Sequence, residues 1–403
     1  MKKKIIIILV VILFIIIDFI ILFFTLNKKD IKEIKSPKKE EIKLETKELN
    51  DLVFEYDSDI YLKDILEIDI EGKLDTLTLG DNTKEITNDR TKYILNYQIV
   101  DTIAPMIMGS TTKTTTKGKD INLVNKYLCG DNHDSKPNCY IEGSYDINKV
   151  GTYNLTYVAI DSSNNKTTKP IKLKVIEKSK SSSSSSSTSK GKTALKTYID
   201  KYKNENTKIG IDVSAWQDNI DWKKAKDNGV EFAMLRIGYG PTSDNEIKLD
   251  KWFNNNIKKT KENNIPVGLY LYSYAKNIKE AKEQAKWIVD KLNGQKIELP
   301  IAFDWENWNS FNKYGVSFKE LNDVAAAFIE EVEKYGYTGM LYSSAYYLNH
   351  IWKNYDNTWL AYYTNNNDFK KPYIMWQLTS SGKVNGISGA VDVDILYNDK
   401  ETH

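Results

Sequence analysis

The chain has 403 residues, enough for two or three domains, and its 41% hydrophobic content is sufficient for packed cores. Lysine and arginine (57 together) nearly balance aspartate and glutamate (55), so the overall charge does not indicate nucleic-acid binding and we expect no such partner. The three histidines are scattered and only two cysteines occur, so no Cys/His cluster can form. We therefore expect no catalytic metal and no cofactor.

The N-terminus begins with lysines at positions 2–4, followed by residues 5–26, which are apolar except for Asp18 and Thr25. As a helix this segment would be roughly 33 Å long, enough to cross a bilayer. No small-residue cleavage site of the kind that ends a secretory signal peptide follows it. We therefore expect residues 1–4 to be cytoplasmic and residues 5–26 to be an uncleaved transmembrane helix.

Residues 27–45 are rich in lysine and glutamate, which is typical of a solvated stalk. Beyond them the pattern changes to short alternating runs, for example at 153–159 and 171–175, as expected of half-buried strands. We expect a small β domain over residues 46–103 and a second one, of antiparallel sandwich type, over residues 104–177.

Cys129 and Cys139 lie in the second of these regions and could close a short loop by a disulfide in an oxidising compartment; two free thiols are the alternative. Residues 100–105 (VDTIAP), the loop after Gly130 and residues 151–161 (GTYNLTYVAID) resemble bacterial Ig-like modules of surface proteins. The resemblance implies a spacer or an adhesive unit with a wall or surface ligand. Residues 46–103 could be a second, poorly matching copy.

Residues 178–194 include an unbroken run of serines, which cannot bury enough surface to order itself. We interpret this segment as a linker and the clearest domain boundary in the chain. The following region, residues 195–403, alternates strand-like runs with helical patterns. Such alternation predicts a parallel sheet, and its eight strand-like runs in this length predict a modified TIM-like β/α barrel. The predicted fold class is thus multidomain: a transmembrane helix, all-β Ig-like sandwich regions and a C-terminal α/β barrel.

The stretch at residues 300–308 (PIAFDWENW) carries two carboxylates, Asp304 and Glu306, separated by one residue. In a strand both side chains would point to the same face, and acids on an inward face cost free energy unless something compensates. Solvated acids at a surface strand end are the alternative. Asp212 and Asp392 also fall at or near ends of predicted strands, where barrel enzymes keep their reactive groups.

Six segments occur in the order seen in glycoside hydrolase family 25, and over residues 207–398 the chain resembles that family. The segments are 210–217 (GIDVSAWQ), 236–240 (RIGYG), 268–274 (GLYLYSY), 303–306 (FDWE), 375–379 (MWQLT) and 389–392 (GAVD). The resemblance implies muramidase (lysozyme) activity, that is, cleavage of the β-1,4 bond between N-acetylmuramic acid and N-acetylglucosamine in peptidoglycan.

Position by position, the resemblance implies that Glu306 is the general acid, Asp304 the second central carboxylate, and Asp212 and Asp392 further acids of the groove. Asp394 is the alternative to Asp392, because it would share the same face of a continuing strand. Glycoside cleavage needs one protonated and one ionised carboxyl, but the sequence does not decide between retention, inversion and assistance by the substrate's acetamido group. Candidate substrate-binding residues, each of which could instead be barrel packing, are Tyr270, Tyr272, Trp305, Tyr342, Trp376 and Gln377.

Together these observations predict a membrane-anchored peptidoglycan hydrolase that acts in wall remodelling or lysis. We expect it in the cell membrane as a single-pass protein, N-terminus inside, with the catalytic domain facing the wall. Its expected partners are glycan strands and, through residues 5–26, the membrane. The alternative is a non-catalytic glycan-binding or adhesive surface protein.

Overall fold

A computed structural model of the chain describes residues 44–178, 192–241 and 246–401. The chain divides into two compact units, one of residues 44–54 and 59–98 and one of residues 55–58 and 99–401, within the described ranges. The expected transmembrane helix (5–26), the cytoplasmic N-terminus and most of the serine-rich linker lie outside the described residues.

The predicted membrane span and the single-pass localisation need correction. No helix within residues 44–178, 192–241 and 246–401 is long and apolar enough to cross a membrane. The described residues therefore do not bear out the predicted transmembrane helix or the single-pass membrane localisation; residues 5–26 themselves lie outside those ranges.

The first unit is built on a three-stranded sheet with the strand order β1-β3-β2. Alternation places Tyr93, Leu95 and Tyr97 of β3 on one buried face, as the sequence pattern predicts. The elements are β1 (Glu45–Glu55), α2 (Leu62–Leu66), β2 (Gly80–Asn88) and β3 (Thr91–Val100).

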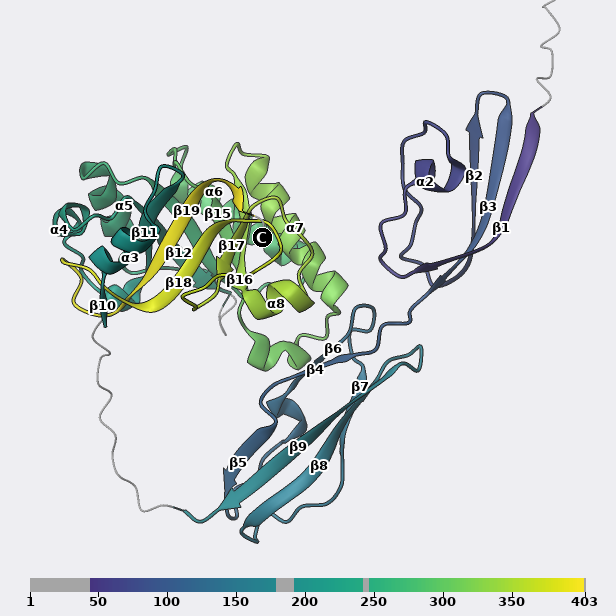
Figure 1. Cartoon of the computed structure of the whole chain (residues 1–403), viewed down its shortest axis with the longest axis horizontal. Coiled ribbons are helices and arrows are strands. Elements are labelled where there is room, and N and C mark those ends of the chain that lie inside the picture. The colour runs from purple at the N-terminus through teal and green to yellow at the C-terminus, as the bar shows by residue number, and fades with distance from the viewer. Residues whose placement is uncertain (1–43, 179–191, 242–245, 402–403) are drawn as a thin grey trace, which may run out of the picture. The chain divides into compact units, whose positions relative to one another are not determined.

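The second unit begins with a β region, residues 99–178, which we call the middle β region (Figure 1). Its sheets have the orders β4-β6 and β5-β9-β8-β7, and Leu155 of β8 pairs with Ile171 of β9 in an antiparallel hairpin. Cys129 and Cys139 form a disulfide. The resemblance to Ig-like modules stays a prediction. The elements are β4 (Met106–Met108), β5 (Thr112–Thr116), η1 (Val124–Lys126), β6 (Leu128–Gly130), β7 (Asn138–Glu142), β8 (Gly151–Ile160) and β9 (Lys166–Ile176).

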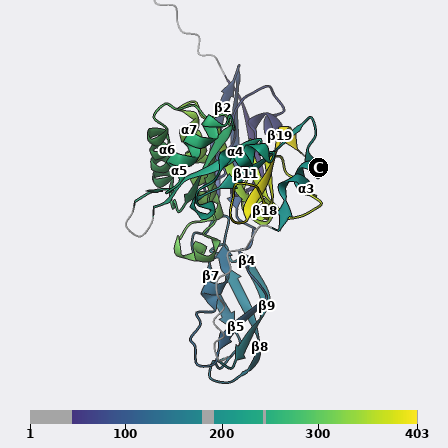
Figure 2. The same cartoon turned by 90° about the vertical axis from the view of Figure 1, so that its left-hand side faces the viewer.

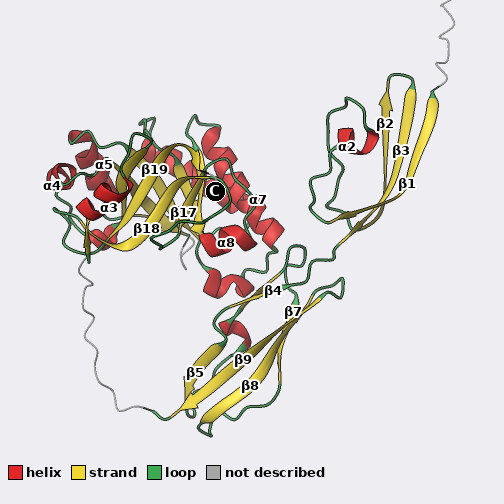
Figure 3. Ribbon diagram, viewed as in Figure 1, coloured by secondary structure: helices red, strands yellow, loops and turns green. Residues whose placement is uncertain are grey.

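The C-terminal part of this unit contains a closed eight-stranded barrel (Figure 3). The elements are β10 (Thr193–Ala194), α3 (Leu195–Tyr202), β11 (Thr207–Val213), η2 (Ala215–Gln217), α4 (Trp222–Asp227), β12 (Phe232–Gly240), β13 (Lys248–Leu249), α5 (Phe253–Glu262), β14 (Val267–Ser273), α6 (Ile278–Leu292), β15 (Ile301–Asp304), η3 (Trp308–Lys313), α7 (Phe318–Glu333), β16 (Gly339–Ser344), α8 (Ala345–His350), β17 (Thr358–Ala361), β18 (Tyr373–Lys383) and β19 (Val391–Glu401).

The barrel strands follow the order β11-β12-β14-β15-β16-β17-β18-β19, and β19 closes the ring by pairing with β11. The pairs from β11 to β18 are parallel, whereas β19 is antiparallel to both of its neighbours. Helices α5, α6 and α7 gather on one side of the barrel and β18 and β19 lie on the other (Figure 2).

The predicted TIM-like β/α barrel is therefore wrong as stated. Strand–helix alternation stops at β17, because the described connections from β17 to β18 and from β18 to β19 contain no helix. A short loop joins β18 to β19, so β19 runs antiparallel to β18. Antiparallel neighbours need no crossover helix. The strand-like runs in the sequence identified the strands, but they carried no information about the direction of the last one.

Candidate active site

The four predicted carboxylates come together at one end of the barrel. Asp212 is close to the end of β11 and Asp304 is the last residue of β15, so the parallel sheet brings both to the same edge. Asp392 lies directly opposite Asp212 in the antiparallel pairing of β19 with β11. Glu306 follows β15 by two residues, and all four line a cavity of about 580 Å³.

Asp304 and Glu306 form a pair that competes for a proton. Asp304 is only 3% exposed, whereas the side chain of Glu306 is open to the cavity. Burial, followed by the charge of Glu306, raises the pKa of Asp304 well above its ordinary value; burial also raises the pKa of Glu306. Because both pKa values are raised, the pair can hold one proton between the two carboxyls.

A second acidic group consists of Asp212, Asp392 and Asp394 on β11 and β19. Asp394 is fully buried and accepts a hydrogen bond from Trp359 Nε1 (2.9 Å), and burial raises its pKa and that of Asp212 well above the ordinary range. Asp392 is only partly buried, and burial raises its pKa to about 6. Asp392 thus reaches the cavity, whereas Asp394, its alternative, lies beneath and contacts Asp212.

Gln377 connects the two sides of the site. Its Nε2 donates to Asp212 Oδ2 (2.8 Å), and its Oε1 accepts from the hydroxyls of Tyr342 (3.0 Å) and Tyr363 (2.9 Å). Tyr342 lines the same cavity as Glu306 and lowers the pKa of that carboxyl, although burial outweighs this effect. A buried amide that uses both its donor and its acceptor in this way fixes the positions of the groups around it.

Arg236 is the cation in the cavity lining. Its guanidinium pairs with Asp250, with Nη2 2.8 Å and Nε 2.9 Å from Oδ2. Asp250 is 1% exposed and also accepts from the backbone N–H groups of Ala215 and Trp252. Arg236 lowers the pKa of Asp304, although burial and Glu306 outweigh it. The arginine therefore favours the ionised form of the deeper carboxyl.

The predicted substrate-binding residues divide into two groups. Tyr270, Tyr272, Tyr342 and Gln377 line the cavity. Trp305 does not: it is fully buried, donates from Nε1 to the Ala275 carbonyl (3.1 Å) and packs among the aromatic rings of η3.

Trp376 does not line the cavity either. It is 2% exposed, donates from Nε1 to the Tyr362 carbonyl (2.8 Å) and packs edge-on against Tyr202. Both tryptophans are packing residues, because their neighbours in sequence point inward and alternation turns them away from the barrel interior. We withdraw both as sugar contacts.

Sequence reasoning missed several cavity residues. Trp216 lies within the segment 210–217, one of the six that resemble family 25. Its side chain is 84% exposed and lines the cavity, which indicates a contact surface and not a core position. Trp359 lines the cavity floor from β17, and Tyr363 follows β17 by two residues. The position of Tyr363 just after a strand end was a usable signal, whereas Trp359 is the second residue of its strand and had no such signal. The hydrogen bond of Asp394 to Trp359 spans two distant strands and had no sequence signal.

A second hollow adjoins the first cavity and shares part of its lining. It has a volume of about 370 Å³ and shares Glu306, Tyr342 and Tyr363 with the first cavity. Its other walls come from β16, α8 and the loop after β17. Glu306 thus lines both hollows.

Residues 211–387 match the sequence model of the family described as glycosyl hydrolases family 25. This region is a family 25 glycosyl hydrolase domain. The match confirms the expected enzyme class, a glycoside hydrolase of the muramidase (lysozyme) kind. In the family 25 domain, Asp212, Asp304 and Glu306 fall inside the matched range, whereas Asp392 lies just beyond it.

Relatives of the family 25 domain share modest identity. The uncharacterized protein YegX of Escherichia coli O157:H7 is 29% identical over 202 residues, or 48% of this chain and 70% of that protein. The autolytic lysozyme of Clostridium acetobutylicum is 24% identical over 192 residues, or 46% of this chain and 54% of the lysozyme.

Among solved structures, the modular autolysin LytC of Streptococcus pneumoniae in complex with a synthetic peptidoglycan ligand is 26% identical with a TM-score of 0.42. That alignment covers 60% of this chain and 56% of the autolysin. The chain thus spans little more than half the length of the autolysin and of the clostridial lysozyme.

Proposed function

We propose that the family 25 domain hydrolyses the β-1,4 bond between N-acetylmuramic acid and N-acetylglucosamine in peptidoglycan, in wall remodelling or lysis. The observation that carries the proposal is the Asp304–Glu306 pair in an open cavity. One carboxyl of the pair is buried and the other is open to the cavity, and both have raised pKa values; a pair of this kind can hold the single proton that glycoside cleavage requires.

The different exposure of the two carboxyls supports their different roles. Glu306 is open to the cavity and can deliver its proton to the leaving glycosidic oxygen as general acid. Asp304 lies deeper, and in its ionised form it would stabilise an anomeric carbon that gains positive charge. Arg236 favours that form, although burial and the charge of Glu306 outweigh its effect on the pKa of Asp304.

Asp304 also leaves one acceptor free. Its Oδ1 is buried and has no hydrogen-bonding partner among the described residues. The N–H of an acetamido group on the bound sugar would satisfy this oxygen and orient the acetamido carbonyl toward the anomeric carbon. Substrate assistance and direct attack by Asp304 are therefore both compatible with the pair.

The shape of the depression supports a polymeric substrate. Glu306 lines both hollows, so sugar units on either side of the bond that is cut could each occupy one of them. Tyr272, Trp216 and Tyr363 supply aromatic faces with polar edges along this path, as sugar rings with apolar faces and peripheral hydroxyls require. Asp212 and Asp392 add acceptors for sugar hydroxyls.

The proposal is tested by release of soluble fragments from purified peptidoglycan by the full chain and by its Glu306→Gln variant. We expect the variant to lose about 10²–10⁴-fold in rate, the usual contribution of a general acid. Glu330→Gln, an exposed glutamate on α7, is the matched control and should keep full activity. Equal rates for wild type and Glu306→Gln would refute the assignment, and glycan binding without any release would favour a non-catalytic binding protein.

A further inference from the structure

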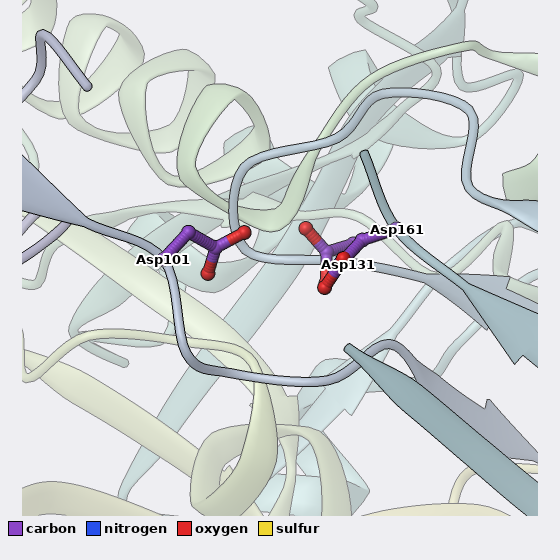
Figure 4. Close-up of side chains that lie close together, drawn as sticks. All are labelled: Asp101, Asp131 and Asp161. Atoms are coloured by element: carbon purple, nitrogen blue, oxygen red, sulfur yellow. The ribbon is translucent and has the colours of Figure 1, made fainter. Parts of the chain in front are cut away.

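Three aspartates converge at one end of the middle β region, away from the catalytic cavity. Each directly follows a strand: Asp101 follows β3, Asp131 follows β6 and Asp161 follows β8. Their carboxyl groups face one another (Figure 4), and one oxygen from each lies within 4.8 Å of the others. All three are buried, with exposed fractions of 6%, 1% and 6%.

Within the part of the chain that the structure describes, this burial leaves the three carboxylates without a compensating cation. Among the described residues, no lysine or arginine forms an ion pair with any of the three carboxylates. Asn132 and Asn165 donate side-chain N–H groups to Asp101 Oδ1 and Asp161 Oδ2, at 3.0 and 2.9 Å. Neutral donors of this kind do not balance three charges in a buried setting.

Asp131 supplies the observation that points to a ligand. Its Oδ1 accepts the backbone N–H groups of His133 and Asp134, both at 2.8 Å, which fixes the carboxylate in place. Its Oδ2 is buried and has no partner among the described residues. Buried acceptors are almost always satisfied, so a fixed carboxylate with one free oxygen in an acidic cluster indicates a bound donor or cation.

Asn132 offers a fourth oxygen. Its Oδ1 is also buried and unpartnered, while its Nδ2 contacts Asp101. A half-turn of the terminal amide exchanges these two atoms and presents the oxygen toward the same carboxylates. These ligands would be three carboxylates and one amide oxygen, with no nitrogen or sulfur among them. Hard divalent cations prefer oxygen ligands of this kind.

We propose that Asp101, Asp131 and Asp161 bind one calcium ion at the end of the middle β region, with Asn132 as an additional oxygen ligand. Oxygens on opposite sides of Ca²⁺ are roughly 4.6–5.2 Å apart. The three carboxylate oxygens lie within 4.8 Å of one another and are therefore close enough to share one such ion. Mg²⁺ usually keeps several waters and is seldom held by a dedicated set of protein ligands, so this ligand set favours Ca²⁺.

The calcium ion would brace a loop that contacts the catalytic domain. The disulfide Cys129–Cys139 closes this loop, and the carbonyls of Asp131 and Asn132 accept the backbone N–H groups of Phe318 (2.7 Å) and Lys319 (3.3 Å). These are first-turn donors of α7 and have no partner within the helix. Calcium binding therefore stabilises the attachment of the middle β region to α7.

The test is calcium titration of the full chain after removal of divalent ions, followed by calorimetry and hydrogen–deuterium exchange. We expect one Ca²⁺ per chain and slower amide exchange in residues 129–139, 161–165 and 317–320. Asp131→Asn preserves the shape of the side chain and should weaken binding by more than about tenfold. Asp120→Asn, an exposed aspartate of the same region, is the matched control and should bind normally.

Several outcomes would overturn the proposal. No heat and no protection at about 10 mM Ca²⁺, tenfold above the weakest constants of calcium modules, would exclude the site. Unchanged binding by Asp131→Asn would place the ion elsewhere, for example among the acids of the catalytic cavity. Should Asp131→Asn fail to fold, Asp161→Asn tests the same site, and the exchange pattern of the wild type does not depend on any variant.

Discussion

Replacement of Gln377 by glutamate should make the stability of the second unit depend strongly on pH. The side chain is 4% exposed and donates from Nε2 to Asp212 Oδ2, while its Oε1 accepts from two tyrosine hydroxyls. Gln377→Glu keeps the shape and the acceptor, but it replaces a donor by a carboxyl next to Asp212 and Asp394. The new carboxyl is stable there only while it holds a proton.

The magnitude follows from the linkage between protonation and folding. An unfolded glutamate titrates near pH 4.3, and burial beside two acids raises the pKa of the folded one. Above pH 4.3 the unfolded state binds fewer protons, so the variant loses about 1.4 kcal/mol per pH unit until the folded pKa is reached. Between pH 5 and pH 7 we expect the variant to lose about 2.7 kcal/mol relative to wild type.

Urea unfolding at pH 5 and pH 7, followed by tryptophan fluorescence, measures this difference. Gln377→Met is the control, because it removes the same hydrogen bonds without adding a titrating group. Its deficit should be about equal at the two pH values. Equal deficits for Gln377→Glu at both pH values would show that position 377 does not lie in an uncompensated acidic environment, and the description of the site would be wrong.

Three further predictions concern tryptophans and Asp392. Trp216→Ala should raise KM for glycan and change the free energy of unfolding by less than about 0.5 kcal/mol, because the side chain is 84% exposed; unchanged KM would argue against a substrate contact. Trp305→Ala should cost about 3–5 kcal/mol in urea unfolding, because it empties a fully buried site; a loss below 1 kcal/mol would contradict its packing role. Asp392 has a pKa of about 6 in the folded chain, so its contribution to stability is complete below about pH 4 and is lost as pH rises through 6; Asp392→Asn should reduce the loss of stability between pH 4 and pH 7, and an unchanged pH profile would contradict the raised pKa.

Much of the site could be predicted because its residues occupy strand ends. Asp304 and Glu306 interrupt an apolar run. Buried acids cost free energy unless partners or solvent stabilise them, so acids in such a position indicate a functional site. The structure brings these two together with Asp212 and Asp392 in one cavity. The sequence alone could not show that Trp305 and Trp376 are packing residues and not sugar contacts. A tryptophan in a strand pattern reads the same whether its ring faces the cavity or the surrounding helices.

Features that depend on distant pairing were not predictable. The antiparallel direction of β19 follows from its short connection to β18, but the sequence alone did not define where β18 ends and so did not define the length of that connection. The contact of Asp394 with Trp359 depends on that direction. The aspartates after β3, β6 and β8 are far apart in sequence and each has an ordinary turn-forming role. Only their convergence in space shows that three buried charges share one small volume.

The most direct test of the account is mass spectrometry of borohydride-reduced fragments that the full chain releases from purified peptidoglycan. Cleavage of the proposed bond leaves N-acetylmuramic acid at the new reducing end, so we expect reduced N-acetylmuramic acid in the wild-type digest and none with Glu306→Gln. Fragments that end in reduced N-acetylglucosamine would show that a different bond is cut and would contradict the proposed specificity.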